Sequence, residues 1–127
     1  MAQGPDRTLK KGDTYPPLIR VLEDEGGPIN LSTATSVRFL ARKDNTLIVA
    51  TCTVTTIAAA KATGFLVGTW ADESITAAVT WTIVTGDTSI AGTYKFEYEI
   101  TWPNSKIETV PNAAAANPVL QIDADND

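Results

Sequence analysis

The chain has 127 residues, of which 43% are apolar and 20% are charged, and its formal net charge is −5 at pH 7. This size and composition predict one globular domain with its own core and argue against a disordered chain. The acidic balance disfavours nucleic acid as a partner, because a negative surface repels phosphate groups.

The residue types that support catalysis are scarce. The chain has no histidine, the commonest general base and metal ligand, and its single cysteine, Cys52, cannot form an intrachain disulfide. Cys52 lies in a β-branched run and is predicted to be a small buried side chain. No nucleophile elbow, phosphate-cradling glycine loop or calcium-loop spacing occurs. We therefore expect no enzyme, no catalytic residue, no cofactor, no metal and no small-molecule substrate.

The N-terminal segment is polar and contains Gly4, Pro5 and Gly12, which predicts an extended arm over residues 1–14. It lacks the apolar core of a signal peptide, and no apolar run in the sequence is long enough to cross a membrane. We expect a chain that folds in the reducing host cytoplasm without a membrane partner. The folded domain is predicted over residues 15–122, with an acidic tail over residues 123–127.

Short segments of alternating polarity fill the first half of the domain. Residues 36–43 place Val37, Phe39 and Ala41 on one face. Residues 46–56 place Ile48, Ala50, Cys52 and Val54 on the face that we predict to be buried. The pair Asp44 and Asn45 between them is a candidate two-residue turn, so the two segments predict a hairpin. For residues 57–63 a helical turn and a continued strand are both open.

The second half contains the clearest strand, residues 93–102, which alternates almost perfectly. Its apolar face needs a second apolar surface opposite it, which predicts a sandwich or a barrel. The apolar face consists of Tyr94, Phe96, Tyr98, Ile100 and Trp102. Residues 75–84 also alternate, with Val79, Trp81 and Ile83 on one side, and residues 85–92 are predicted to form a loop.

The complete pattern predicts an all-β fold. The predicted strands are residues 18–22, 29–31, 36–43, 46–56, 65–70, 75–84, 93–102, 106–110 and 118–122. Turn residues separate most of them, and no helix of normal length is expected. These features are typical of an immunoglobulin-like antiparallel β-sandwich of about 7–9 strands.

Aromatic residues mark two further features. The spacing of Asp87, Gly92 and Tyr94 resembles the tyrosine corner of immunoglobulin folds, which predicts a structural hydroxyl bond from Tyr94 to the preceding turn. Trp81 is predicted to lie in the core. Trp70 and Trp102 could instead form an exposed binding surface, and for Trp102 an interface anchor and edge packing are equally open.

Two stretches resemble the N-terminal domain of phage baseplate upper proteins. The first is GDTYPPLIRVLEDEGGPINLSTATSVRFLARK, residues 12–43. The second combines Trp81, Gly86-Asp87-Thr88, the strand from Gly92 to Ile100, and Glu108-Thr109-Val110-Pro111. The resemblance covers most of residues 12–122 and involves turn and core positions. The chain departs from the family in a longer segment over residues 55–80 and in ending after the domain, as a free-standing module would.

The resemblance implies a structural protein of a tailed-phage virion, with an immunoglobulin-like domain that docks onto other virion proteins and onto copies of itself. Docking is expected through terminal arms and an edge strand, with Leu9, Tyr15, Pro16 and Trp102 as partner contacts. The position in the virion stays open between tail, baseplate and head-tail collar. The alternatives are a capsid decoration protein and a carbohydrate- or receptor-binding module that uses Trp70 or Trp102.

Overall fold

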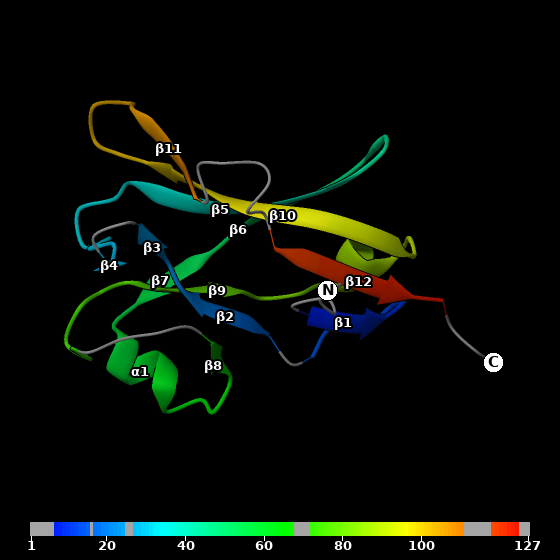
Figure 1. Cartoon of the computed structure of the whole chain (residues 1–127), viewed down its shortest axis with the longest axis horizontal. Coiled ribbons are helices and arrows are strands. Elements are labelled where there is room, and N and C mark those ends of the chain that lie inside the picture. Colours follow the sequence, from blue (N-terminus) through cyan, green and yellow to red (C-terminus); the bar gives the residue numbers. More distant parts are fainter. Residues whose placement is uncertain (1–6, 16, 25–26, 68–71, 111–117, 125–127) are drawn as a thin grey trace, which may run out of the picture.

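The computed structural model describes residues 7–15, 17–24, 27–67, 72–110 and 118–124, which form twelve strands and two short helices (Figure 1). The elements are β1 (Arg7–Lys10), β2 (Leu18–Val21), β3 (Glu23–Asp24), β4 (Gly27–Pro28), β5 (Ser36–Lys43), β6 (Thr46–Thr51), β7 (Thr53–Thr55), α1 (Ile57–Lys61), β8 (Leu66–Val67), β9 (Ala78–Trp81), the 3₁₀ helix η1 (Thr85–Thr88), β10 (Gly92–Thr101), β11 (Ile107–Val110) and β12 (Val119–Asp123).

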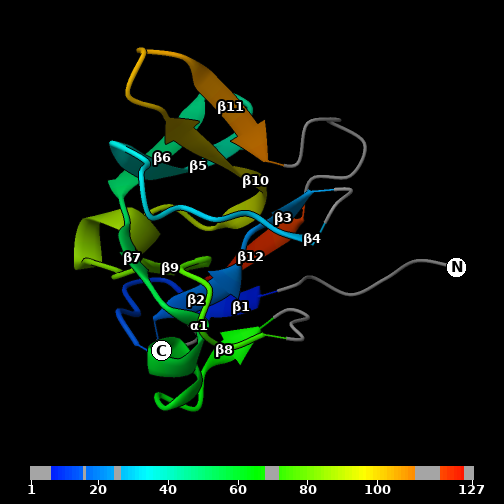
Figure 2. The same ribbon diagram turned by 90° about the vertical axis from the view of Figure 1, so that its left-hand side faces the viewer.

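Two sheets pack face to face, so the all-β sandwich that the sequence predicts is confirmed. One sheet has the order β1-β12-β10-β5-β6, with β11 also paired to β10, and the other has the order β7-β9-β2-β8. Strands β3 and β4 form a separate pair. In Figures 1 and 2 the β5–β10 layer lies on one side of the β9–β2 layer, and α1 lies on the other side. The orders β12-β10-β5-β6 and β7-β9-β2 correspond to G-F-C-C′ and D-E-B of an immunoglobulin sandwich.

Two pairings differ from the predicted antiparallel sheet. Strands β1 and β12 pair in parallel, and so do β2 and β8, which makes both sheets mixed. Residues 7–10 are therefore a strand, although the sequence predicts an arm over residues 1–14. A polar stretch can form an edge strand when one side chain is buried, and in β1 that side chain is Leu9, which is 3% exposed.

The clearest strand is split between two partners along one edge. Residues 92–95 of β10 pair with β12, while residues 98–101 pair with β11. Strand β5 pairs with the opposite edge of β10 over residues 95–101, so β11 and β12 share one edge as two halves of a G-like strand. Strand β12 also extends to Asp123, which the sequence places in the acidic tail.

The hairpin of β5 and β6 forms as predicted. It pairs Lys43 with Thr46 at the turn, where Asp44 adopts a positive φ of 47°. A short polar side chain tolerates this left-handed conformation better than other non-glycine residues do. Ile48 is buried, and Ala50, Cys52 and Val54 pack partly buried against the core. The predicted inner face of this segment is thus confirmed.

Residues 57–61 form α1, which resolves the two alternatives left by the sequence. The hydroxyl of Thr56 accepts a 3.2 Å hydrogen bond from the Ala59 N–H and caps the helix. Ile57 and Ala60 are buried against apolar side chains of β2. Strand β2 is consequently covered on both faces, which is why its four residues show no polar alternation.

Stacked aromatic rings join the two sheets. Phe39 of β5 stacks on Trp81 of β9, with ring centroids 4.0 Å apart and planes inclined by 12°. Phe96 and Tyr98 of β10 contact the same Phe39 ring. The Trp81 indole N–H also donates a 3.2 Å hydrogen bond to Asp87 Oδ2 at η1. The predicted core position of Trp81 is confirmed, and its ring fixes the spacing of the sandwich.

The predicted tyrosine corner is present at the start of β10. The Tyr94 hydroxyl donates a 2.7 Å hydrogen bond to the carbonyl oxygen of Ile90, four residues earlier. The Asp87 carboxylate accepts the Val84 N–H and so closes the preceding turn. Tyr94 therefore ties the loop before the strand to the core, as such tyrosines do in immunoglobulin-like domains.

Candidate interaction surface

The part of the chain that the structure describes contains neither a candidate metal site nor a helix that could span a membrane. Among these residues no group of three or more histidine, cysteine, aspartate or glutamate side chains is placed to hold a metal ion. Within the same residues, no helix has the length and apolar character needed to cross a membrane.

The single thiol is held in its protonated form. Cys52 packs partly buried against the core, with Sγ 3.9 Å from the Ala50 carbonyl oxygen. Burial raises the pKa of the Cys52 thiol to about 12, which a backbone hydrogen bond involving Phe39 only partly offsets. Because the thiolate is the nucleophilic form, Cys52 at neutral pH behaves as a small apolar side chain.

Alkylation of Cys52 by iodoacetamide at pH 8 is expected to be at least about tenfold slower in the folded protein than in the urea-unfolded chain. An ordinary thiol with a pKa near 8.5 is partly ionised at this pH, whereas Cys52 is not. Mass spectrometry of timed samples measures both rates. Equal rates at pH 8 would contradict the buried, protonated thiol, and replacement by Cys52→Ala provides the zero-rate control.

Leu9, predicted as a partner contact, is instead part of the core. Its side chain is 3% exposed and belongs to the cluster that fills the sandwich. The prediction treats residue 9 as part of a free arm. In the structure β1 pairs with β12, and that pairing turns the leucine inward.

Tyr15 is the predicted contact residue that remains available. Its side chain is 68% exposed and rests edge-on against Phe65, with ring centroids 5.5 Å apart. The loop before it is anchored, since Gly12 N–H donates to Thr88 O and Thr88 Oγ1 donates to Asp13 O. Tyr15 is thus presented from a fixed loop. Pro16, the other predicted contact in this loop, lies outside the described residues.

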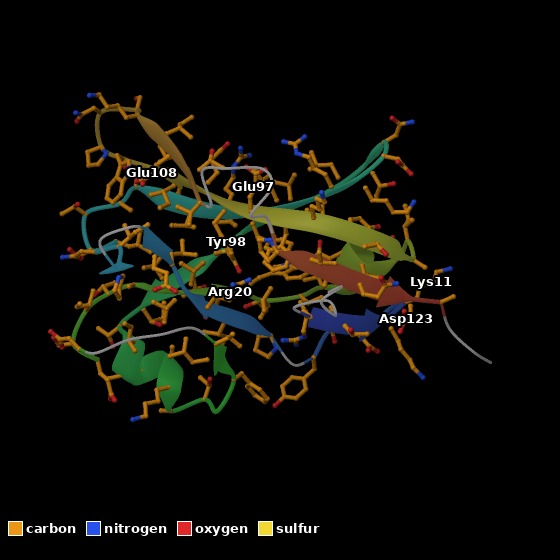
Figure 3. The ribbon with its side chains drawn as sticks, in the orientation of Figure 1. Lys11, Arg20, Glu97, Tyr98, Glu108 and Asp123 are labelled. Carbon is orange, nitrogen blue, oxygen red and sulfur yellow. The ribbon has the colours of Figure 1, made fainter. Side chains whose placement is uncertain are left out.

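The tryptophans do not form an exposed aromatic surface in the described residues. Trp102 is half-buried, packs against the core and donates a 3.1 Å hydrogen bond from Nε1 to Glu108 Oε1 of β11. Figure 3 labels this glutamate beside the β10–β11 end of the sheet. Of the two alternatives for Trp102, edge packing is the one observed. Trp81 is fully buried, and Trp70 lies outside the described residues.

An exposed apolar strip that the sequence interpretation missed lies along β6. Leu47 is 48% exposed and Val49 is 43% exposed, on the face opposite the core. Strand β6 ends the first sheet and, in the described part of the chain, pairs with β5 alone. Alternation places both side chains on the outer face, but it cannot show that the strand lies at a sheet edge. We call residues 46–51 the β6 edge.

A polar group without a partner lies between the sheets. The Tyr98 hydroxyl is buried and has no hydrogen-bond partner among the described residues. Figure 3 places Tyr98 of β10 and Arg20 of β2 in the space between the two layers. The Arg20 guanidinium lies 5.4 Å from the centroid of the Phe96 ring. Burial raises the pKa of Tyr98, against the opposing effect of Arg20, so the phenol is neutral. Because water does not reach it, the hydroxyl belongs to the core rather than to a surface site.

Comparison of the chain with known protein families, with curated proteins and with solved structures gave no match.

Proposed function

We propose that this chain is a structural protein of a tailed-phage virion that docks onto neighbouring tail, baseplate or head-tail collar subunits in symmetric copies. The observation that carries the proposal is where the apolar surface lies. Among the exposed aromatic and aliphatic side chains, Tyr15 lies in a fixed loop, and Leu47 and Val49 lie on a strand edge of an immunoglobulin-like sandwich. An exposed loop and an open strand edge are typical contacts of protein partners, whereas small molecules bind in concave sites.

Further support comes from how the polar side chains are used. Arg38 pairs with Glu99 across β5 and β10, Lys61 pairs with Glu73, and Asp87 closes the turn at η1. These bonds link neighbouring elements of the domain, and none of them lies in a cluster with metal-ligand geometry among the described residues. The resemblance to phage baseplate upper proteins adds the context of a virion, in which rigid small domains bind neighbours of fixed symmetry.

The proposal is tested by labelling. A phage carrying an epitope-tagged copy of this chain is purified, and antibody-gold is located on the particles by negative-stain electron microscopy. Label on the tail, baseplate or collar is the expected result. Absence of the tagged chain from purified particles would overturn the virion role, and label over the capsid would overturn the tail, baseplate or collar placement.

The role of the exposed loop is tested in the same particles. Tyr15→Ala is expected to reduce the tagged chain per virion at least about fivefold, because an exposed aromatic anchor contributes about 1 kcal/mol or more to docking. Val84→Ala is the matched control, since Val84 is 58% exposed but lies outside this loop. Equal incorporation of both variants would exclude Tyr15 as a contact.

A further inference from the structure

The edges of the two main sheets differ in how they are protected against pairing with another chain. Within the described residues, β1 carries Arg7 and Lys10, β11 carries Glu108, β7 has three residues and β8 has two. Charge and shortness are the usual means by which proteins block an open edge. The β6 edge has six residues, TLIVAT, with no charge, proline or glycine. It is the one long, unprotected edge of the described sheets.

The β6 edge directs backbone N–H and C=O groups that do not bond to β5 outward. Cys52 N–H donates a 2.9 Å hydrogen bond to the carbonyl of Val37, the residue opposite it in the β5–β6 register. Hydrogen-bonded and non-hydrogen-bonded pairs alternate along antiparallel strands. The peptide groups of Leu47, Val49 and Thr51 therefore point away from β5, and each offers one donor and one acceptor at the edge.

We propose that the β6 edge pairs antiparallel with the β6 edge of a second copy, about a two-fold axis that passes between the two Val49 residues. Val49 then lies opposite Val49 of the second copy, and Leu47 lies opposite its Thr51. In this register all three outward peptide groups meet their counterparts. The inference rests on the proposed function, for which it names the strand that joins copies.

Side chains on both faces of the sheet favour a second copy as the occupant. A register shifted by one residue would set outer residues against core residues, because strand side chains alternate with a period of two. In the proposed register the exposed Val49 side chains of the two copies lie side by side on the outer face, each next to Leu40, its β5 partner, which is 5% exposed in the single chain. On the inner face, Ala50 lies opposite Ile48 of the other copy, and both are apolar.

Charge does not oppose a second copy at the β6 edge itself. Each copy carries a net charge of −5, so two copies repel one another in general. The β6 edge has no charged residue, and its β5 neighbours on the outer face are Arg38, Leu40 and Arg42. Two copies can approach along this neutral edge without bringing carboxylates together. One strand pair is smaller than a standard interface, so a weak, concentration-dependent dimer is expected.

Sedimentation of the purified full chain over a range of concentrations tests the pairing. Val49→Lys places two like charges directly opposite each other and is expected to weaken the dimer at least about tenfold. Val84→Lys is the matched control, because it replaces another exposed valine, 58% exposed against 43% for Val49, away from a sheet edge and should leave the dimer unchanged. Circular dichroism checks that both variants are folded.

Disulfide trapping tests the register itself, in a Cys52→Ala background. Residues opposite each other in a hydrogen-bonded pair have Cα atoms about 5.5 Å apart, within the range of a disulfide. Val49→Cys alone is expected to form a linked dimer. Leu47→Cys and Thr51→Cys proteins are expected to link when mixed, and not when each is oxidised separately.

A chain that is monomeric at all concentrations, or a dimer that Val49→Lys leaves intact, would overturn the pairing. Linkage of Leu47→Cys to itself would overturn the register. These measurements use purified protein alone, whereas the virion role is tested by labelled particles. Failure of the pairing with tagged chain still present on tails would overturn this inference and leave the proposed function standing.

Discussion

Replacement of Trp81 by alanine is expected to lower the free energy of unfolding by about 3–5 kcal/mol, the usual cost of deleting a large buried aromatic side chain. Trp81 is fully buried and stacks on Phe39 of the opposite sheet at 4.0 Å. Its loss opens a cavity between the two layers and removes the indole bond to Asp87. Denaturant unfolding followed by far-UV circular dichroism measures the change, because the substitution removes part of the fluorescence signal.

Two further substitutions separate the contributions of Trp81. Trp81→Phe keeps a ring against Phe39 and loses the indole N–H, so its cost is expected to lie well below that of Trp81→Ala. Val84→Ala, at an exposed position three residues away, is expected to change the free energy of unfolding by less than about 0.5 kcal/mol. A cost below about 1 kcal/mol for Trp81→Ala would show that the aromatic stack does not hold the sheets together.

Sequence periodicity is sufficient to predict most of this sandwich. The alternation of β10 and β6 depends on side chains that are buried on one face only, and such strands show their orientation directly, whereas in β5 Leu40 on the outer face is buried as well. The tyrosine corner is predictable for the same reason, because its bond from Tyr94 to Ile90 is local in sequence. Features that depend on local geometry can thus be predicted without the structure.

The parts that sequence does not predict depend on which elements are neighbours in space. Strand β1 is polar and becomes a strand because β12 accepts it in parallel. Strand β2 is buried on both faces because α1 covers its outer side, and α1 itself is a single capped turn stabilised by that contact. The sequence predicts a partner-binding arm at Leu9 because the pairing of β1 with β12 has no local signal.

The candidate interaction surface also combines a feature that sequence predicts with one that depends on the fold. The exposure of Leu47 and Val49 follows from alternation, but their value as an interaction site follows from the position of β6 at the end of its sheet. Sheet order is a long-range property, which no local pattern encodes. Trp102 illustrates the converse, because its position at a strand end leaves exposure and edge packing equally open, and β11 decides between them by giving it a hydrogen-bond acceptor in Glu108.

The same chemical change on two tyrosines of β10 is expected to have opposite effects on stability. Tyr94→Phe removes a hydroxyl that donates to the Ile90 carbonyl at 2.7 Å, and it should lower the free energy of unfolding by about 1 kcal/mol. Tyr98→Phe removes a buried hydroxyl that has no partner among the described residues, and it should raise the free energy of unfolding by about 1–2 kcal/mol. Denaturant unfolding at pH 7 measures both.

The pH dependence of stability gives an independent test of Tyr98. Burial raises the pKa of its phenol, so the unfolded chain releases this proton at a lower pH than the folded chain does. The raised pKa of Tyr98 therefore leaves the free energy of unfolding independent of pH below about pH 10, the ordinary pKa of tyrosine, and lowers it as the pH rises beyond that value. Tyr98→Phe removes the ionisable group. The free energy of unfolding of the variant should therefore fall less steeply with pH above pH 10 than that of the wild type.

Because the two tyrosines lie four residues apart on one strand, roughly 13 Å, their effects should add in the double variant. The double variant is then expected to differ little from the wild type at pH 7. A destabilising Tyr98→Phe would mean that the hydroxyl makes a hydrogen bond in solution, for example by accepting one from the Arg20 guanidinium, which can only donate. That outcome would contradict the view of Tyr98 as an unpartnered core residue.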